Sequence, residues 1–131
     1  MAASLPYPSL YATHGGIWAA RPDGEIRVLG RGEAIGLAAE SPMIMLNVPL
    51  IGQRIGYPEL SGLDLLELFA FVHPARFAVP TPKGLADALG LTPPSDDPTA
   101  AAFLIEAAAR LLSTLDGDWP EREGAWASAQ A

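Results

Sequence analysis

The longest apolar segment of the chain lies near its middle, in residues 63–72, where only Asp64 and Glu67 are polar. Apolar side chains on nearly every side predict a helix that is covered on most of its circumference. Ser61 is the predicted N-cap of this central helix, and Asp64 would reach back to a free backbone N–H. The dipeptide His73-Pro74 predicts its end, because proline disfavours helical backbone in the preceding residue.

Start and stop signals predict four further helices. Thr81 is a predicted N-cap, with Pro82 at the first helical position and Gly90 just past the end. The other expected helices cover residues 31–40, 49–57 and 99–115.

Shorter apolar runs predict strands. Residues 16–20 and 25–29 flank a segment containing Asp23-Gly24, a strong tight-turn signal, so they predict a hairpin. The continuous apolar run in residues 43–48 is typical of a strand buried on both faces. Residues 4–14 are interpreted as an irregular segment that is interrupted by prolines and leads to the first strand, with Tyr7 and Tyr11 as aromatic anchors. The pattern therefore predicts an α/β domain, a small mixed sheet with an N-terminal hairpin covered by helices.

Composition narrows the possible functions. A chain of 131 residues, half of them apolar, is expected to fold as one domain. Its net charge of −7 opposes binding to phosphate backbones. The absence of cysteine excludes a disulfide framework, a thiolate zinc site and an iron–sulfur cluster within these residues. Without a basic N-terminal signal or an apolar run of about 20 residues, we expect a soluble cytoplasmic domain with no membrane partner.

Candidate chemistry is sparse. The chain lacks the Gly-x-x-x-x-Gly-Lys-Ser/Thr loop that holds a nucleoside triphosphate. Asp64 and Glu67 lie three residues apart on one helix face, a spacing at which two carboxylates can share a metal or divide acid and base roles. In the alternative, favoured interpretation, both are structural acids in the first turns, where the helix dipole stabilises negative charge.

The order of segments resembles the second half of a DnaQ-like, ribonuclease H-type 3′–5′ exonuclease domain. The resemblance is carried by residues 43–51 (MIMLNVPLI), 63–68 (LDLLEL), 73–91 (HPARFAVPTPKGLADALGL) and the helix over 99–115. In that family a buried strand ends in His-Asn-x-x-Phe-Asp, and the last helix carries His-x-Ala-x-x-Asp. Asn47 falls at the family's asparagine.

The metal ligands of that family are missing from this chain. Leu46 stands at the histidine and Ile51 at the metal-binding aspartate, while Ala102 stands at the aspartate of the last helix. Residues 16–20, expected as the first strand, lack Asp-x-Glu. Two-metal hydrolysis requires carboxylates that hold both metal ions. The resemblance therefore implies a truncated exonuclease-like fold that lacks nuclease activity. A residual metal-dependent exonuclease that uses Asp64 and Glu67 is the alternative.

A second resemblance spans nearly the whole chain. The segments 13–18 (THGGIW), 30–35 (GRGEAI), 47–63 (NVPLIGQRIGYPELSGL), 65–84 (LLELFAFVHPARFAVPTPKG) and 119–126 (WPEREGAW) are similar to the amino-terminal region of alphaproteobacterial DinG-like ATP-dependent DNA helicases, relatives of the XPD helicases. In such proteins the motor, with its nucleotide loop and iron–sulfur cysteines, lies downstream. The resemblance implies ATP, magnesium and an iron–sulfur cluster for the parent and no cofactor for this chain. The family's functional residues match no position here.

We therefore expect residues 1–118 to form a non-catalytic accessory domain of a helicase that unwinds DNA in repair. Residues 119–131 would begin a further helix or a linker toward the motor. Trp119 and Trp126 are the expected docking surface for the motor or a repair partner, with nucleic acid bound only through the parent. A free-standing protein-interaction domain is a third possibility, and the oligomeric state is left open.

Overall fold

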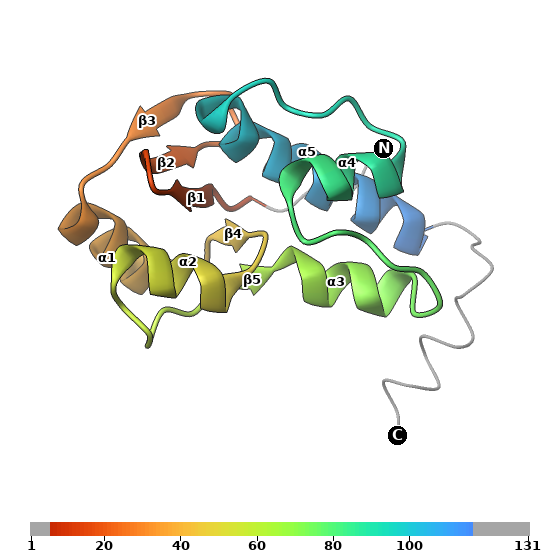
Figure 1. The fold of residues 1–131 in the computed structure, drawn as a ribbon, viewed down its shortest axis with the longest axis horizontal. Helices are drawn as coiled ribbons and strands as arrows, with labels where there is room; N and C mark the ends of the chain where they lie inside the picture. The colour runs from red at the N-terminus through yellow and green to blue at the C-terminus, as the bar shows by residue number, and fades with distance from the viewer. Residues whose placement is uncertain (1–5, 117–131) are drawn as a thin grey trace.

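The computed structural model describes residues 6–116, which form an α/β fold with a mixed sheet between helices (Figure 1). This confirms the predicted fold class. In chain order the elements are β1 (Ser9–Thr13), β2 (Gly16–Ala20), β3 (Ile26–Val28), α1 (Arg31–Glu40), β4 (Ile44–Met45), α2 (Val48–Ile55), β5 (Leu63–Asp64), α3 (Leu65–Val72), α4 (Pro82–Leu89) and α5 (Asp97–Asp116).

The sheet has the strand order β3-β2-β1-β4-β5. The pairs β1–β2 and β2–β3 are antiparallel, whereas β1–β4 and β4–β5 are parallel. Only β2 therefore runs against the other strands. The predicted hairpin is confirmed as β2–β3, and its turn places Gly24 at φ 97°, in the left-handed half of backbone space that favours glycine.

Two strands were not predicted. The central strand β1 was interpreted as an irregular approach because Pro6 and Pro8 precede it. Pro8 lies just outside β1, and its carbonyl oxygen accepts a hydrogen bond from the Ile44 backbone N–H at 2.8 Å. The two-residue strand β5 was assigned to a helix, because its apolar pattern continues into α3.

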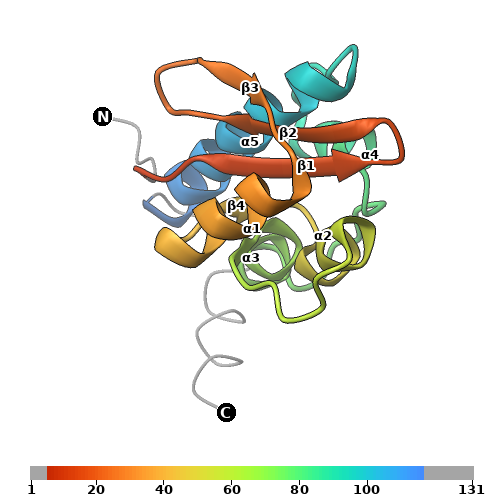
Figure 2. The ribbon, with the colours of Figure 1, turned by 90° about the vertical axis from the view of Figure 1, so that its left-hand side faces the viewer.

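The sheet separates two apolar cores. Figure 2 shows α5 behind strands β1 and β2 and α1 in front of them. One core joins β4 to α3, α4 and α5, and its fully buried members include Val72, Leu85, Leu104 and Leu111. The other joins the sheet to α1 and α2 and includes Leu10, Met45 and Ile51. Neighbouring residues of β4 face opposite cores, Ile44 the first and Met45 the second, as strand alternation requires.

The central helix is α5 and not α3, which corrects the expectation for residues 63–72. Helix α3 buries Leu65, Phe69 and Val72 on one face, whereas Glu67 and Ala70 are exposed. Helix α5 packs against β1, β2, β3 and β4 and against α3 and α4. Small side chains on α5 allow this close approach. The buried alanines of the helix are Ala100, Ala101, Ala107 and Ala108.

The cap of α3 also differs from the expectation. The N-cap is Asp64, whose Oδ1 accepts the Leu66 backbone N–H at 2.8 Å, and Ser61 lies outside the helix. The reason is the pairing of β5 with β4, which holds Leu63 and Asp64 in extended conformation. The helix therefore begins only at Leu65.

The predicted caps of α4 are confirmed, whereas α2 (Val48–Ile55) and α5 (Asp97–Asp116) begin one and two residues earlier than expected. Thr81 caps α4 by accepting the Gly84 N–H at 2.9 Å, and the C-caps Gly56 of α2 and Gly90 of α4 have φ of 72° and 70°. Asp96 and Thr99 form a reciprocal capping arrangement at the start of α5: the Thr99 N–H donates to Asp96 Oδ1 at 2.9 Å, and the Asp96 N–H donates to Thr99 Oγ1 at 3.1 Å. Among residues 6–116, no helix is both long enough and apolar enough to cross a membrane.

Candidate functional site: a pocket at the switch point of the sheet

A pocket opens where the chain leaves two neighbouring parallel strands in opposite directions. From β1 the chain turns to β2 on one side, and from β4 it passes through α2 to β5 on the other side. Ligands of open α/β sheets bind at such switch points, outside the carboxyl ends of the strands. A cavity of about 160 Å³ lies here, and we call it the switch-point pocket; its walls include Tyr11, Asn47, Ile51, Arg54, Thr81 and Pro82.

Arg54 places a positive charge in the switch-point pocket. Its Nη1 donates to the Ala12 carbonyl oxygen of β1 at 2.7 Å, and its guanidinium also hydrogen-bonds the Tyr11 side chain. Helix α2 positions this arginine in its last turn. The guanidinium therefore bridges α2 and the central strand.

Tyr11 is held as a neutral phenol. Burial raises the pKa of Tyr11 above its ordinary value, and the negative charge of Asp97 raises it further, while Arg54 partly opposes both. Asp97, the first residue of α5, accepts a hydrogen bond from Thr13 Oγ1 at 2.9 Å. The pocket thus combines a phenol and a guanidinium, and the Asp97 carboxylate acts on the phenol from outside the pocket lining.

Among the predicted site residues that the structure describes, Asn47 alone lines the switch-point pocket. It is the N-cap of α2, and its Oδ1 accepts the Leu50 N–H at 3.3 Å. An asparagine at this position is therefore explained by capping.

Asp64 and Glu67 lie in a different place. They share the wall of a separate hollow of about 420 Å³ beside β4 and α3. Both Asp64 oxygens accept backbone N–H groups, Oδ1 from Leu66 at 2.8 Å and Oδ2 from Val48 at 3.0 Å. Glu67 is exposed in the first turn of α3. Asp64 therefore caps α3 while its second oxygen binds the first N–H of α2.

The described residues offer no set of three or more histidine, cysteine, aspartate or glutamate side chains that could hold a metal ion. At the exonuclease-type aspartate positions, Ile51 is buried and Ala102 is partly buried. The switch-point pocket can accept hydrogen bonds and present donors, but none of the described residues that line it is a carboxylate. Trp119 and Trp126 fall outside the described residues.

Sequence reasoning missed Tyr11, Arg54 and Asp97 as neighbours because it missed β1. A usable signal was present in residues 9–13, where Leu10 and Ala12 alternate with more polar side chains. Recognising that strand would have placed Tyr11 in the middle of a central strand. Comparisons with protein-family models, with curated proteins and with solved structures found no match to this chain.

Proposed function

We propose that the chain is a non-catalytic accessory domain of a DinG-like ATP-dependent DNA helicase that acts in the cytoplasm in DNA repair. Its scaffold would be an exonuclease-like fold whose metal site has been replaced. The helicase part of the proposal rests on the sequence resemblance. The non-catalytic part rests on one observation, the Arg54 guanidinium in the switch-point pocket.

A two-metal nuclease needs negatively charged ligands at the carboxyl ends of its central strands, whereas this pocket contains a positively charged guanidinium. Such an enzyme holds two divalent cations with carboxylates at the carboxyl ends of its central strands. In this chain the Arg54 guanidinium is bound to the Ala12 carbonyl oxygen, and the buried side chain of Ile51 lines the same pocket. Arg54 is exposed, and its positive charge opposes the binding of a divalent cation in this pocket.

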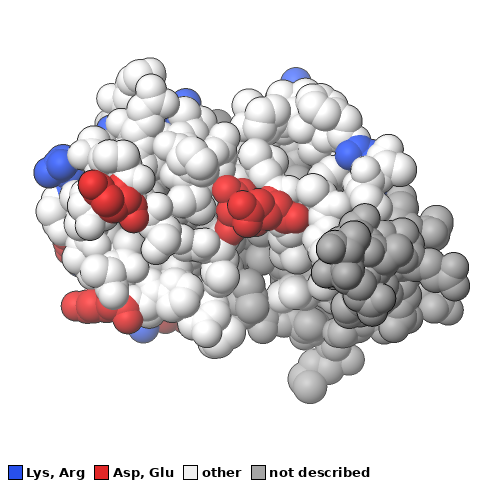
Figure 3. Space-filling view, turned by 90° about the horizontal axis from the view of Figure 1, so that it is seen from below, with Lys and Arg blue, Asp and Glu red and all other residues white. Residues whose placement is uncertain are grey.

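Two further features support the proposal. The antiparallel β1–β2–β3 meander, followed by two parallel strands on the other side of β1, fits a ribonuclease H-type sheet. The surface also offers little to a phosphate backbone: on the face drawn in Figure 3, basic side chains are few and scattered, and carboxylates lie among them. With a net charge of −7, the chain would depend on its parent for DNA contact.

The non-catalytic assignment can be tested on the 131-residue chain itself. We expect no cleavage of single-stranded DNA in the presence of Mg²⁺ or Mn²⁺, and no heat of metal binding by calorimetry. Cleavage that Asp64→Asn abolishes, while Glu59→Gln in an exposed loop leaves it unchanged, would show that the residual exonuclease is correct and the proposal wrong.

The helicase assignment needs a different experiment. We expect the reading frame of the native transcript to continue beyond Ala131 into a Gly-x-x-x-x-Gly-Lys-Ser/Thr loop and a cysteine cluster. In that longer protein, Trp126→Ala should weaken docking of residues 1–118 on the motor, seen as faster protease cleavage between them. A native protein whose mass corresponds to a chain ending at Ala131 would instead support a free-standing interaction domain.

A further inference from the structure

A hollow with apolar walls opens beside β5, the last strand on its side of the sheet, and we call it the leucine hollow. Its volume is about 420 Å³, and the buried residues Ile44 and Leu65 form part of its walls. Three half-buried leucines from three elements also line it: Leu63 of β5, Leu68 of α3 and Leu112 of α5. Leu112 belongs to neither of the two apolar cores, so its side chain has apolar surface left to cover.

The leucine hollow also has two carboxylates in its lining, Asp64 and Glu67. Both Asp64 oxygens already accept backbone N–H groups. Glu67 is exposed, and within residues 6–116 no basic side chain forms an ion pair with it. The hollow therefore suits an occupant with a large apolar surface and one hydrogen-bond donor for Glu67. The indole ring of tryptophan has both properties.

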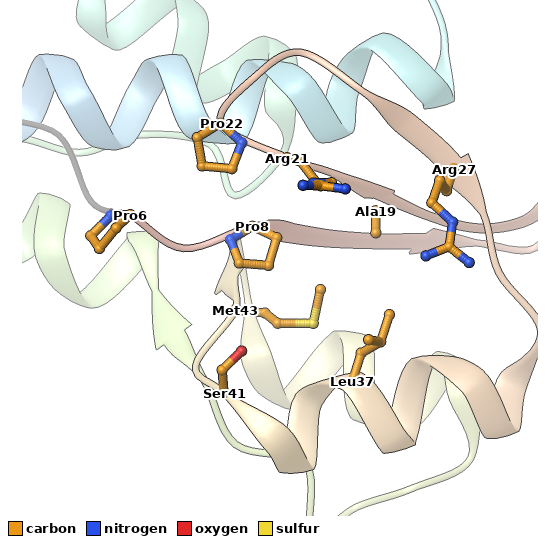
Figure 4. A pocket seen from close by; sticks show the side chains of 9 residues that line it. All are labelled: Pro6, Pro8, Ala19, Arg21, Pro22, Arg27, Leu37, Ser41 and Met43. Atoms are coloured by element: carbon orange, nitrogen blue, oxygen red, sulfur yellow. The ribbon is translucent and has the colours of Figure 1, made fainter.

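On the other side of the sheet, a terminal segment already forms part of a cavity wall. In Figure 4, Pro6 and Pro8 line a cavity of about 360 Å³ together with Leu37 and Met43 of the α1–α2 side. These prolines precede β1, so they belong to the segment that enters the fold. At the leucine hollow the neighbouring segment is the one that leaves the fold, because Leu112 lies about one turn before the end of α5.

The chain that follows α5 starts within reach of the leucine hollow. From Leu112 to Asp116, the last residue of α5, the helix rises by about 6 Å. Trp119 comes three residues after Asp116, and three extended residues span at most about 10 Å. Trp119 is also the first large apolar residue after α5. It can therefore return by one helical turn and place its indole ring against Leu112.

The sequence around Trp119 favours a reversal of the chain at this point. Gly117 comes directly after α5, where glycine readily adopts the left-handed backbone that ends many helices. Pro120 disfavours helical backbone in the residue before it, which is Trp119. We therefore do not expect α5 to continue through Trp119 and carry the indole ring away from the domain.

We propose that Trp119 folds back onto its own domain and fills the leucine hollow. Its ring packs on the leucines of the hollow, and its indole N–H donates to the Glu67 carboxylate. The short connection favours this tryptophan over one from a second copy, because a short linker gives an effective concentration on the order of 1 mM or more. Trp126 then remains available to a partner. This inference goes beyond the proposed function and does not depend on the helicase assignment.

Nuclear magnetic resonance of the 131-residue chain with isotope-labelled leucine methyl groups tests the proposal. We expect nuclear Overhauser contacts between the Trp119 indole and the methyl groups of Leu63, Leu68 and Leu112, and upfield ring-current shifts of those methyl groups. Trp119→Ser should abolish the contacts and the shifts, because the aromatic ring is lost. Trp126→Ser is the matched control from the same segment and should leave both unchanged.

The hydrogen bond to Glu67 is tested at the indole N–H. Its exchange with water should be slower at Trp119 than at Trp126, and Glu67→Ala should accelerate it at Trp119 alone. Exchange at Trp119 that Glu67→Ala leaves unchanged would overturn the assignment of Glu67 as the acceptor.

Three results would overturn the docking of Trp119 itself. In the first, Trp119→Ser leaves the methyl resonances of the leucine hollow where they were. In the second, Trp126→Ser moves them and Trp119→Ser does not, so the occupant is Trp126. In the third, the contacts weaken on dilution, so the occupant comes from a second copy. The buried Leu104 methyl groups serve as the control for folding, because their resonances should stay unchanged in both serine variants.

Discussion

At the scale of single residues, one carboxylate ties two helices together. Asp64 binds the first N–H of α2 with one oxygen and caps α3 with the other. The sequence allowed a metal-binding or a structural interpretation of Asp64 and Glu67, and the capping geometry accounts for Asp64. The contact with Val48 could not be predicted, because it joins residues that only the pairing of β4 with β5 brings together.

Replacing Asp64 should therefore cost more than an ordinary cap. We expect Asp64→Ala to lower the free energy of unfolding by about 1–3 kcal/mol, because the N–H groups of Leu66 and Val48 both lose their acceptor. Urea unfolding followed by circular dichroism measures the change.

Glu67→Ala is the matched control on the same helix. Glu67 is exposed, and we expect its removal to change the free energy of unfolding by about 0.5 kcal/mol or less. Equal losses for the two variants would contradict the assignment of Asp64 as the residue that joins α2 and α3.

At the scale of elements, the ends of α4 were predicted, whereas the start of α3 and the short strands were not. Thr81, Gly56 and Gly90 act through bonds within a few residues, so the local sequence contains the signal. Strand β5 has only two residues and exists because β4 lies beside it. The switch-point pocket was missed for the same reason, since its walls come from β1, α2 and the start of α4.

Two glycines in helices should respond to alanine in opposite directions. Gly36 in α1 has no atom within 4 Å of the place a Cβ would take, so Gly36→Ala should raise the free energy of unfolding by about 0.5–1 kcal/mol through helix propensity. Gly84 in α4 packs directly on Val79, and a Cβ there would clash with the Val79 backbone oxygen and side chain. Gly84→Ala should lower the free energy of unfolding by about 1–3 kcal/mol despite alanine's better propensity.

Thermal and urea unfolding of both variants separate these effects. Stabilisation by Gly84→Ala would mean that residues 79–81 do not pack on α4 as described. A loss at Gly36 would mean that the exposed face of α1 contacts something else.

At the scale of the whole molecule, one sheet couples two cores. The α/β class and the presence of each described helix were predicted from the spacing of apolar residues and from the capping residues, prolines and glycines at helix ends. The strand order was not, because it depends on which strands meet across long separations: β1 pairs with β4 at Ser9 and Ile44. The central role of α5 was hidden for a related reason, since its small alanines look less apolar than the leucines of α3.

The shared sheet predicts one cooperative transition. Leu104→Ala in the α3–α5 core and Ile51→Ala in the α1–α2 core should each lower the free energy of unfolding by about 2–5 kcal/mol. Both losses should appear in the same urea transition, whether it is followed by circular dichroism or by hydrogen exchange. A variant in which one core exchanges freely while the other stays protected would show that the two layers unfold separately.

The position of α5 also has a consequence for synthesis on the ribosome. Strands β1, β2 and β3 are made first, yet the helix that covers one of their faces is made about 80 residues later, as the 84-residue separation of the Thr13–Asp97 hydrogen bond indicates. Until α5 leaves the exit tunnel, the nascent chain keeps a half-covered sheet with an open β3 edge. This interval is when the domain is most exposed to aggregation and in greatest need of a chaperone.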